Sequence, residues 1–235
     1  MMEIFKNITT VFVDLDDTIW WFSKNSLQSL RHVFDQFGIG KFCDYETFDM
    51  HYHYINSHLW NEYHHGRIPK EVLVNERFRY ALEKSGCPTG AIDGKAMNSE
   101  YLDFLSRLPL AVPGAEEMLS YIHSKYDVNV LSNGFKGVQQ RKLASSGLDK
   151  YIHQVVLSDD CGITKPLRGI FDYALDRCHA TAQKSVMIGD NYETDICGAH
   201  DAGWHTIYFN ADAAQGNYPS ADAMVTSLAQ IMDIL

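Results

Sequence analysis

The chain has 235 residues, of which 46% are hydrophobic and 21% charged, enough for one large domain or a core with an insertion. Its net charge of −10 argues against nucleic acid or an acidic membrane surface as a partner. The five cysteines are scattered without a CxxC pair, and the N-terminus carries no long apolar segment. We therefore expect reduced thiols in a cytoplasmic protein with neither a signal peptide nor a membrane span.

The first predicted element is a strand over residues 11–13, which runs directly into Asp14 and Asp16. A continuous run of β-favouring apolar residues is typical of a parallel strand buried on both faces. Ligands bind at the carboxyl edge of such sheets, and side chains two apart on an extended segment face the same way. We expect both carboxylates to face one small site, where they repel each other unless a cation or a shared proton relieves them.

Helical spacing replaces strand-like runs between residues 25 and 108. A first helix carries the apolar stripe Leu27, Leu30, Phe34 and Phe37. The further expected helices cover residues 47–64, the segment after Pro69, and residues 91–107. This pattern predicts an all-helical insertion that forms a separate small bundle.

Strands and helices alternate from residue 112 onward. The expected strands cover residues 128–131, 155–157, 185–188 and 206–209. The expected helices cover residues 115–125, a segment ending at 147, and residues 170–178, 194–202 and 228–235. Repeated βα units imply an α/β fold with a doubly wound parallel sheet. We expect residues 1–19 and 109–235 to form this core and residues 20–108 to form an inserted helical cap.

Two later segments offer groups that bind anions. Ser132 and Asn133 follow a predicted strand and supply a hydroxyl, an amide and backbone N–H groups at a strand-to-helix turn. Lys165 supplies a positive charge in a loop that Pro166 stiffens. Taken singly, Ser132 would more often be an ordinary turn serine or a helix cap than a phosphate ligand, and the alternative for Lys165 is a surface lysine.

Asp190 and Asp195, at the end of the strand over residues 185–188, return negative charge to the same edge of the sheet. Carboxylates and an anion cradle belong together when a divalent cation joins them. Oxygen-only ligands with strong negative charge select Mg²⁺, and the bridged anion is then expected to be a phosphate. Asp195 alone would also suit a helix cap.

The ordered set of motifs resembles that of the haloacid dehalogenase (HAD) superfamily of phosphohydrolases. The matching residues are Asp14, Asp16 and Thr18 of DxDxT, Ser132, Lys165, and Asp190 and Asp195 of GDxxxxD. The resemblance implies a HAD-like Rossmannoid core with a helical C1-type cap. Residues 59–66 and 75–78 look more loosely like the cap of the house-cleaning nucleotidases, which dephosphorylate pyrimidine nucleoside monophosphates.

The resemblance also implies a mechanism. Asp14 would be the nucleophile that forms an aspartyl-phosphate, and Asp16 the general acid that becomes the base for the attacking water. Because a halide leaves without a proton, the acid at position 16 favours phosphoryl chemistry over dehalogenation.

The remaining implied roles concern binding. Mg²⁺ would be held by Asp14, the Asp16 backbone carbonyl and Asp190. Ser132, Asn133 and Lys165 would hold the phosphate, and Asp195 would orient metal-bound waters or Lys165. The expected substrate is a small phosphomonoester, a nucleoside 5′-monophosphate in the first place. A sugar-phosphate phosphatase, a phosphoglucomutase-type transferase and a non-catalytic phosphate-binding protein remain alternatives.

Aromatic residues follow the nucleophile loop. The ring of Trp20 can stack on a nucleobase or pack the cap against the core, and we hypothesise that it lines the substrate pocket. The histidines of the insertion form no tight set of metal ligands, so we expect them to be solvated or partly buried; they are His51, His53, His58, His64 and His65.

Overall fold

The computed structural model describes residues 3–88 and 90–235, which divide into two compact units. One unit combines the described residues up to Phe22 with Pro109–Leu235, and the other is Ser23–Leu108. Trp20 and Trp21, which we assigned to the cap, belong to the unit that contains the sheet. Their backbone N–H groups bind within that unit: Trp20 N donates to Leu15 O at 2.9 Å, and Trp21 N donates to Leu110 O at 3.0 Å.

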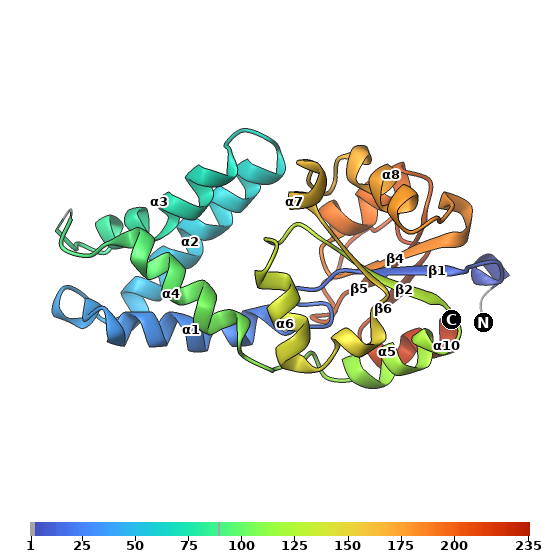
Figure 1. Cartoon of the computed structure of the whole chain (residues 1–235), viewed down its shortest axis with the longest axis horizontal. Coiled ribbons are helices and arrows are strands. Elements are labelled where there is room, and N and C mark those ends of the chain that lie inside the picture. Colours follow the sequence, from blue (N-terminus) through green and yellow to red (C-terminus); the bar gives the residue numbers. More distant parts are fainter. Residues whose placement is uncertain (1–2, 89) are drawn as a thin grey trace. The chain divides into compact units, whose positions relative to one another are not determined.

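A six-stranded parallel sheet forms the centre of the first unit, in the order β3-β2-β1-β4-β5-β6 (Figure 1). The strands are β1 (Thr10–Val13), β2 (Asp127–Ser132), β3 (Gln154–Leu157), β4 (Ser185–Gly189), β5 (His205–Phe209) and β6 (Ala223–Val225). The chain winds outward from β1 to β3 and then crosses to β4 on the other side. The carboxyl ends of β1 and β4 therefore meet where the winding reverses, which is where ligands bind in such sheets.

Helices cover both faces of the sheet (Figure 1). They are α5 (Ala115–His123), α6 (Val138–Ser146), α7 (Ser158–Cys161), α8 (Arg168–Arg177), α9 (Gly198–Asp201) and α10 (Ile231–Ile234). On the side of α8 and α9, the indole of Trp204 packs between Phe12 of β1 and Phe171 of α8, at ring-centroid distances of 4.6 and 5.3 Å. This arrangement confirms the predicted doubly wound α/β core.

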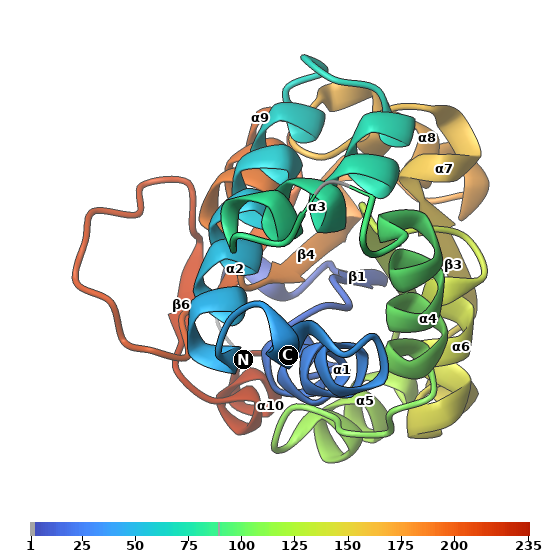
Figure 2. The same ribbon diagram turned by 90° about the vertical axis from the view of Figure 1, so that its left-hand side faces the viewer.

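Three elements of this unit differ from the expectation. The helix expected over residues 194–202 begins as a π-helical turn at Tyr192–Cys197, and α9 follows it. The last helix is a 3₁₀ turn at Leu228–Gln230 that continues as α10. We did not predict β6, because a three-residue strand carries no periodic signal and exists through its pairing with β5. The long loop before β6 projects from the sheet in Figure 2.

The second unit consists of α1, of which Phe22 belongs to the first unit, and three further helices. Their bounds are α1 (Phe22–Gln36), α2 (Tyr45–His64), α3 (Lys70–Lys84) and α4 (Gly94–Ser106). Helix α3 packs against both α2 and α4 (Figure 2). Helix α4 begins later than expected because the Asp93 side chain caps it, accepting hydrogen bonds from Lys95 N and Ala96 N.

The buried face of α1 is more polar than its apolar stripe suggested. Leu27 is 41% exposed, whereas Ser26 and Ser29 are buried. Burial is tolerated because each hydroxyl has a partner: Ser26 Oγ pairs with Tyr101 Oη at 2.8 Å, and Ser29 Oγ donates to Asn25 O. Within residues 3–88 and 90–235, no helix has the length and apolar content required to cross a bilayer.

Candidate active site

The loop after β1 presents the first acidic residue of the site. Asp14 N still donates to Ile188 O of β4 at 2.9 Å, so the sheet extends up to the carboxylate that follows β1. The chain then folds back, with Trp20 N donating to Leu15 O at 2.9 Å. Asp17 adopts a left-handed backbone with φ 58°, which non-glycine residues rarely do. The loop is therefore held in one conformation beside the strand end.

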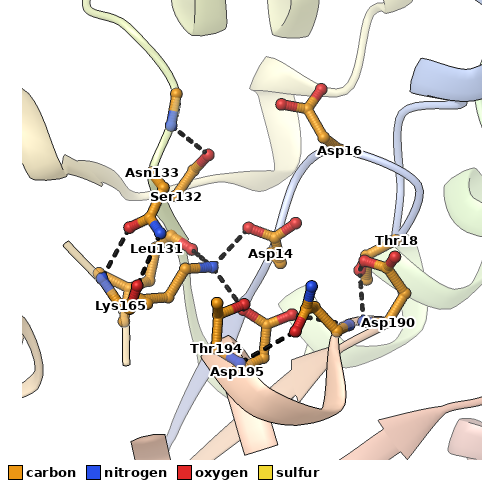
Figure 3. A network of polar contacts seen from close by, with 12 residues as sticks. Asp14, Asp16, Thr18, Leu131, Ser132, Asn133, Lys165, Asp190, Thr194 and Asp195 are labelled. Carbon is orange, nitrogen blue, oxygen red and sulfur yellow. Dashed lines mark hydrogen bonds and ion pairs between the residues drawn. The ribbon is translucent and has the colours of Figure 1, made fainter. Parts of the chain in front are cut away.

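Lys165 lies at the centre of a buried cluster of charges (Figure 3). Its Nζ lies 2.6 Å from Asp14 Oδ1 and 2.6 Å from Asp195 Oδ1, and it donates to Leu131 O at 2.8 Å. Burial opposes the charged ammonium, but the two carboxylates outweigh burial and raise the pKa of Lys165. The side chain is thus a permanent positive charge in direct contact with Asp14.

Negative charge nevertheless exceeds what Lys165 neutralises. Burial raises the pKa of Asp14 to about 7; Lys165 opposes this shift, while Asp195 and Asp16 add to it. Burial, together with the charges of Asp14 and Asp195, also raises the pKa of Asp190 well above its ordinary range. These carboxylates lie in an environment that favours a bound cation.

Asp14, Asp190 and Asp195 each offer a carboxylate oxygen, and these three oxygens lie within 4.8 Å of one another. Thr18 fixes Asp190, since its Oγ1 donates to Asp190 Oδ1 at 2.8 Å and accepts from Asp190 N at 3.1 Å. A closely spaced set of oxygen donors with several negative charges suits a hard divalent cation such as Mg²⁺. The arrangement explains why a threonine stands at position 18.

Asn133 connects the turn after β2 to the lysine loop. Its Nδ2 donates to Lys165 O at 2.9 Å and its Oδ1 accepts from Lys165 N at 2.8 Å (Figure 3). The side-chain amide therefore positions the loop of Lys165. Its backbone remains the part of the residue that we expect to face a phosphate. Ser132 is buried at the same turn, where its Oγ accepts a hydrogen bond from Gly134 N.

Asp16 lies apart from this cluster. In Figure 3 its carboxylate turns away from Asp14. Lys142 Nζ lies 2.7 Å from Asp16 Oδ1, and Gln139 Nε2 donates to Asp16 Oδ2 at 2.8 Å. We did not predict either partner from the sequence. The available signal was their spacing, since positions three apart on the helix after Ser132 share a face.

Trp20 is fully buried, and Lys142 Nζ lies 4.7 Å from its ring centroid, within the range of a cation–π contact. Its role in a substrate pocket stays a prediction. In the described part of the chain, the acidic triad is the set of His, Cys, Asp or Glu side chains close enough to hold a metal. The histidines of the second unit do not form such a set.

Comparisons with known proteins bear on this geometry. A family model described as haloacid dehalogenase-like hydrolase matches residues 8–203. The chain is 29% identical over 208 residues to the HAD-hydrolase YfnB of Bacillus subtilis, covering 88% of this chain and 86% of the relative. A magnesium-bound crystal structure of YfnB superposes with a TM-score of 0.88 and 26% identity, covering 97% of this chain and 99% of that one.

A second relative is the pyrimidine 5′-nucleotidase YjjG of Escherichia coli. It is 30% identical over 206 residues, which cover 86% of this chain and 85% of the relative. The ribulose-1,5-bisphosphate 5-phosphatase of Halopiger xanaduensis is 33% identical, over 63% of each chain. From the match of the family model and the extent of these similarities, it follows that the chain belongs to the haloacid dehalogenase-like hydrolase family.

Proposed function

We propose that this protein is a Mg²⁺-dependent phosphatase whose substrate is a pyrimidine nucleoside 5′-monophosphate. As a phosphoric monoester hydrolase it must attack phosphorus and protonate a poor leaving group. The observation that carries the proposal is the contact of Lys165 with Asp14 inside a group of three close carboxylates. Such a site pairs an acidic nucleophile with a fixed ammonium and leaves a surplus of carboxylate charge for a divalent cation, which suits phosphoryl transfer.

In the proposed reaction, an Asp14 oxygen forms a bond to phosphorus while the ester P–O bond breaks. Asp16 gives its proton to the departing alcohol oxygen and later takes a proton from water. That water oxygen attacks the phosphorus of the aspartyl-phosphate, which releases inorganic phosphate and restores Asp14. Lys165 and the Ser132 hydroxyl hold the non-bridging oxygens as negative charge develops on them.

The donor set fits Mg²⁺, because all its side-chain donors are carboxylate oxygens. Asp14, Asp190 and the Asp16 backbone carbonyl would hold the ion. When bound, it would neutralise the repulsion between the nucleophile and the phosphate. Both oxygens of the Asp195 carboxylate already have partners. Oδ1 lies 2.6 Å from Lys165 Nζ, and Oδ2 accepts a hydrogen bond from Asn191 N at 3.1 Å. We assign Asp195 the orientation of Lys165.

The nucleotide substrate is supported by YjjG, whose similarity extends over most of both chains. The sugar-phosphate alternative rests on relatives such as the Halopiger enzyme, where the similarity covers less of the chain. Trp20 is buried in this structure, so a contact with the base requires its ring to become exposed when the substrate binds. Unchanged KM and kcat for nucleotides in Trp20→Ala would remove it from the pocket.

The test is phosphate release from UMP, dTMP, glucose 1-phosphate and ribulose 1,5-bisphosphate, each with MgCl₂ and with EDTA. We expect preference for the pyrimidine nucleotides and no turnover in EDTA. Higher kcat/KM on the sugar phosphates would favour the second candidate. Transfer of the phosphoryl group between sugar positions, without release, would favour a mutase. No phosphate release from the whole panel would contradict the proposal.

A further inference from the structure

Two buried polar side chains on one helix contact Asp16. Gln139 and Lys142 lie three residues apart in α6, so they share a helix face. Both are buried: Gln139 is 0% and Lys142 3% exposed. Each binds a different oxygen of the Asp16 carboxylate, at 2.8 and 2.7 Å. Long polar side chains are rarely buried without a specific partner, so this face of α6 is built around Asp16.

The Gln139 amide links Asp16 to Ser132. Its Nε2 carries two hydrogens, one directed to Asp16 Oδ2 and the other to Ser132 Oγ at 2.8 Å. The amide nitrogen, which can donate, faces Asp16 and Ser132, and the amide oxygen, which can only accept, faces away from them. Gln139 Oε1 is thereby left buried without a hydrogen-bond partner among residues 3–88 and 90–235. The two hydrogen bonds donated by Nε2 therefore determine the orientation of the amide, although the buried oxygen loses the hydrogen bond that it would make in water.

The same contact orients the Ser132 hydroxyl. A serine oxygen has two lone pairs and one hydrogen. Ser132 Oγ accepts from Gly134 N at 3.1 Å and from Gln139 Nε2, so both lone pairs are used. Its hydrogen must therefore point to a third group. A phosphate oxygen at this turn would accept it.

Gly134 leaves the space that the Gln139 side chain occupies. A Cβ at this position would lie 2.1 Å from Gln139 Nε2 and 2.3 Å from its Cδ. Any other residue would displace the amide from Ser132 and Asp16. The absence of a side chain at Gly134 therefore allows the Gln139 amide to contact Ser132 and Asp16.

The geometry points to Gln139 and Lys142 as positioning residues for catalysis. Both hold the carboxylate of Asp16 in place, and Gln139 also orients the hydroxyl of Ser132. This inference rests on the proposed function, in which Asp16 protonates the leaving oxygen. Of the two groups Asp16 and Ser132, the Lys142 side chain contacts Asp16, and it also lies over the Trp20 ring. Gln139 acts on Asp16 and on the phosphate-binding serine, so it joins proton transfer to phosphate binding.

The effect on proton transfer by Asp16 can be separated from the effect on phosphate binding by Ser132, because only proton transfer depends on the leaving group. Phenyl phosphate needs its leaving oxygen protonated, whereas 2,4-dinitrophenyl phosphate releases 2,4-dinitrophenolate, a stable anion that needs no acid. General acid catalysis contributes about 10²–10⁴-fold, so we expect Lys142→Met to lower kcat/KM for phenyl phosphate about 100-fold. The loss on 2,4-dinitrophenyl phosphate should be at least ten times smaller. Gln139→Leu should show the same selectivity, together with a higher KM for both esters because Ser132 is released.

The matched control is Gln140→Leu. Gln140 is the neighbouring glutamine of α6, and its side chain is exposed. The control should keep the wild-type ratio of kcat/KM between the two esters. In an Asp16→Asn background, Lys142→Met should have little further effect on phenyl phosphate, since residues that act through one group are not additive. Circular dichroism and thermal melts identify variants that remain folded.

An unchanged ratio between the two esters in folded Lys142→Met would overturn the inference, as would full additivity with Asp16→Asn. Should Gln139→Leu fail to fold, the Lys142 variants decide by the same ratio. Wild-type enzyme that releases phosphate from neither ester, and from neither UMP nor dTMP, contradicts the proposed function itself. Active wild-type enzyme with an unaltered ratio in the variants contradicts only the positioning role.

Discussion

Replacing Lys165 with methionine removes the positive charge at the centre of the site and keeps much of the apolar stem. The ammonium contacts two carboxylates at 2.6 Å, and its side chain is 2% exposed. Without it, Asp14 and Asp195 face each other with no buried countercharge. Breaking a buried pair by removing one partner costs about 3–5 kcal/mol, and two partners are stranded here, so we expect a loss near the upper end.

For a chain of this length, each kcal/mol lowers Tm by about 2–4 °C, so Lys165→Met should melt at least about 10 °C lower. The assay is thermal and urea unfolding in EDTA, followed by tryptophan fluorescence. Trp60→Phe removes the tryptophan of the second unit, so that the signal reports the unit with the sheet.

The control is Lys150→Met, which breaks the exposed ion pair between Lys150 Nζ and Glu116 Oε1 at 2.9 Å. Solvent screens that pair, so its removal should leave the transition almost unchanged. If Lys165→Met were no less stable than Lys150→Met, the charge cluster would not stabilise the fold and our account of Lys165 would be wrong.

Three further outcomes follow from the site. Asp14→Asn should lower phosphate release at least about 10³-fold while circular dichroism stays unchanged, since only the nucleophile is lost; retained turnover would exclude Asp14 as the nucleophile. MgCl₂ at 100 times its dissociation constant should stabilise the fold by about 2.7 kcal/mol, measured as a rise in Tm that EDTA reverses and Asp190→Asn abolishes. Gly134→Ala should raise KM and lower kcat for phosphate esters, because its Cβ overlaps the Gln139 amide; wild-type kinetics would refute that contact.

Composition and local pattern were sufficient for the architecture. Apolar runs such as residues 11–13 form strands because a strand buried on both faces must be apolar along its whole length. Polar residues at the ends of β1, β2 and β4 predicted one shared edge, since parallel strands bring their carboxyl ends together. Lys165, in the loop that follows β3 and α7, lies at the same edge and contacts Asp14, 151 residues away in the sequence.

The hydrophobic periodicity of the sequence did not predict short or irregular elements. β6 has three residues and depends on its neighbour β5 for hydrogen bonds. The turn at Tyr192–Cys197 is π-helical, whereas its sequence only signals a helix. In the second unit, Leu27 is exposed while Ser26 and Ser29 of α1 are buried. Their burial is tolerated because Ser26 Oγ pairs with the distant Tyr101 Oη and Ser29 Oγ donates to Asn25 O within the helix.

The alternation of apolar strands and helices in the sequence predicted the class of fold, and the resemblance of the ordered acidic residues, serine and lysine to the HAD motifs indicated the chemistry to expect. Only the tertiary structure decided how the groups pair. It shows that Asn133 holds the Lys165 loop, that Asp16 turns to Gln139 and Lys142, and that Gly134 makes room for the Gln139 amide. The physical reason is that a motif reflects the local path of the backbone. Hydrogen-bond partners are instead chosen among side chains from distant segments, according to distance, burial and the number of donors each can offer.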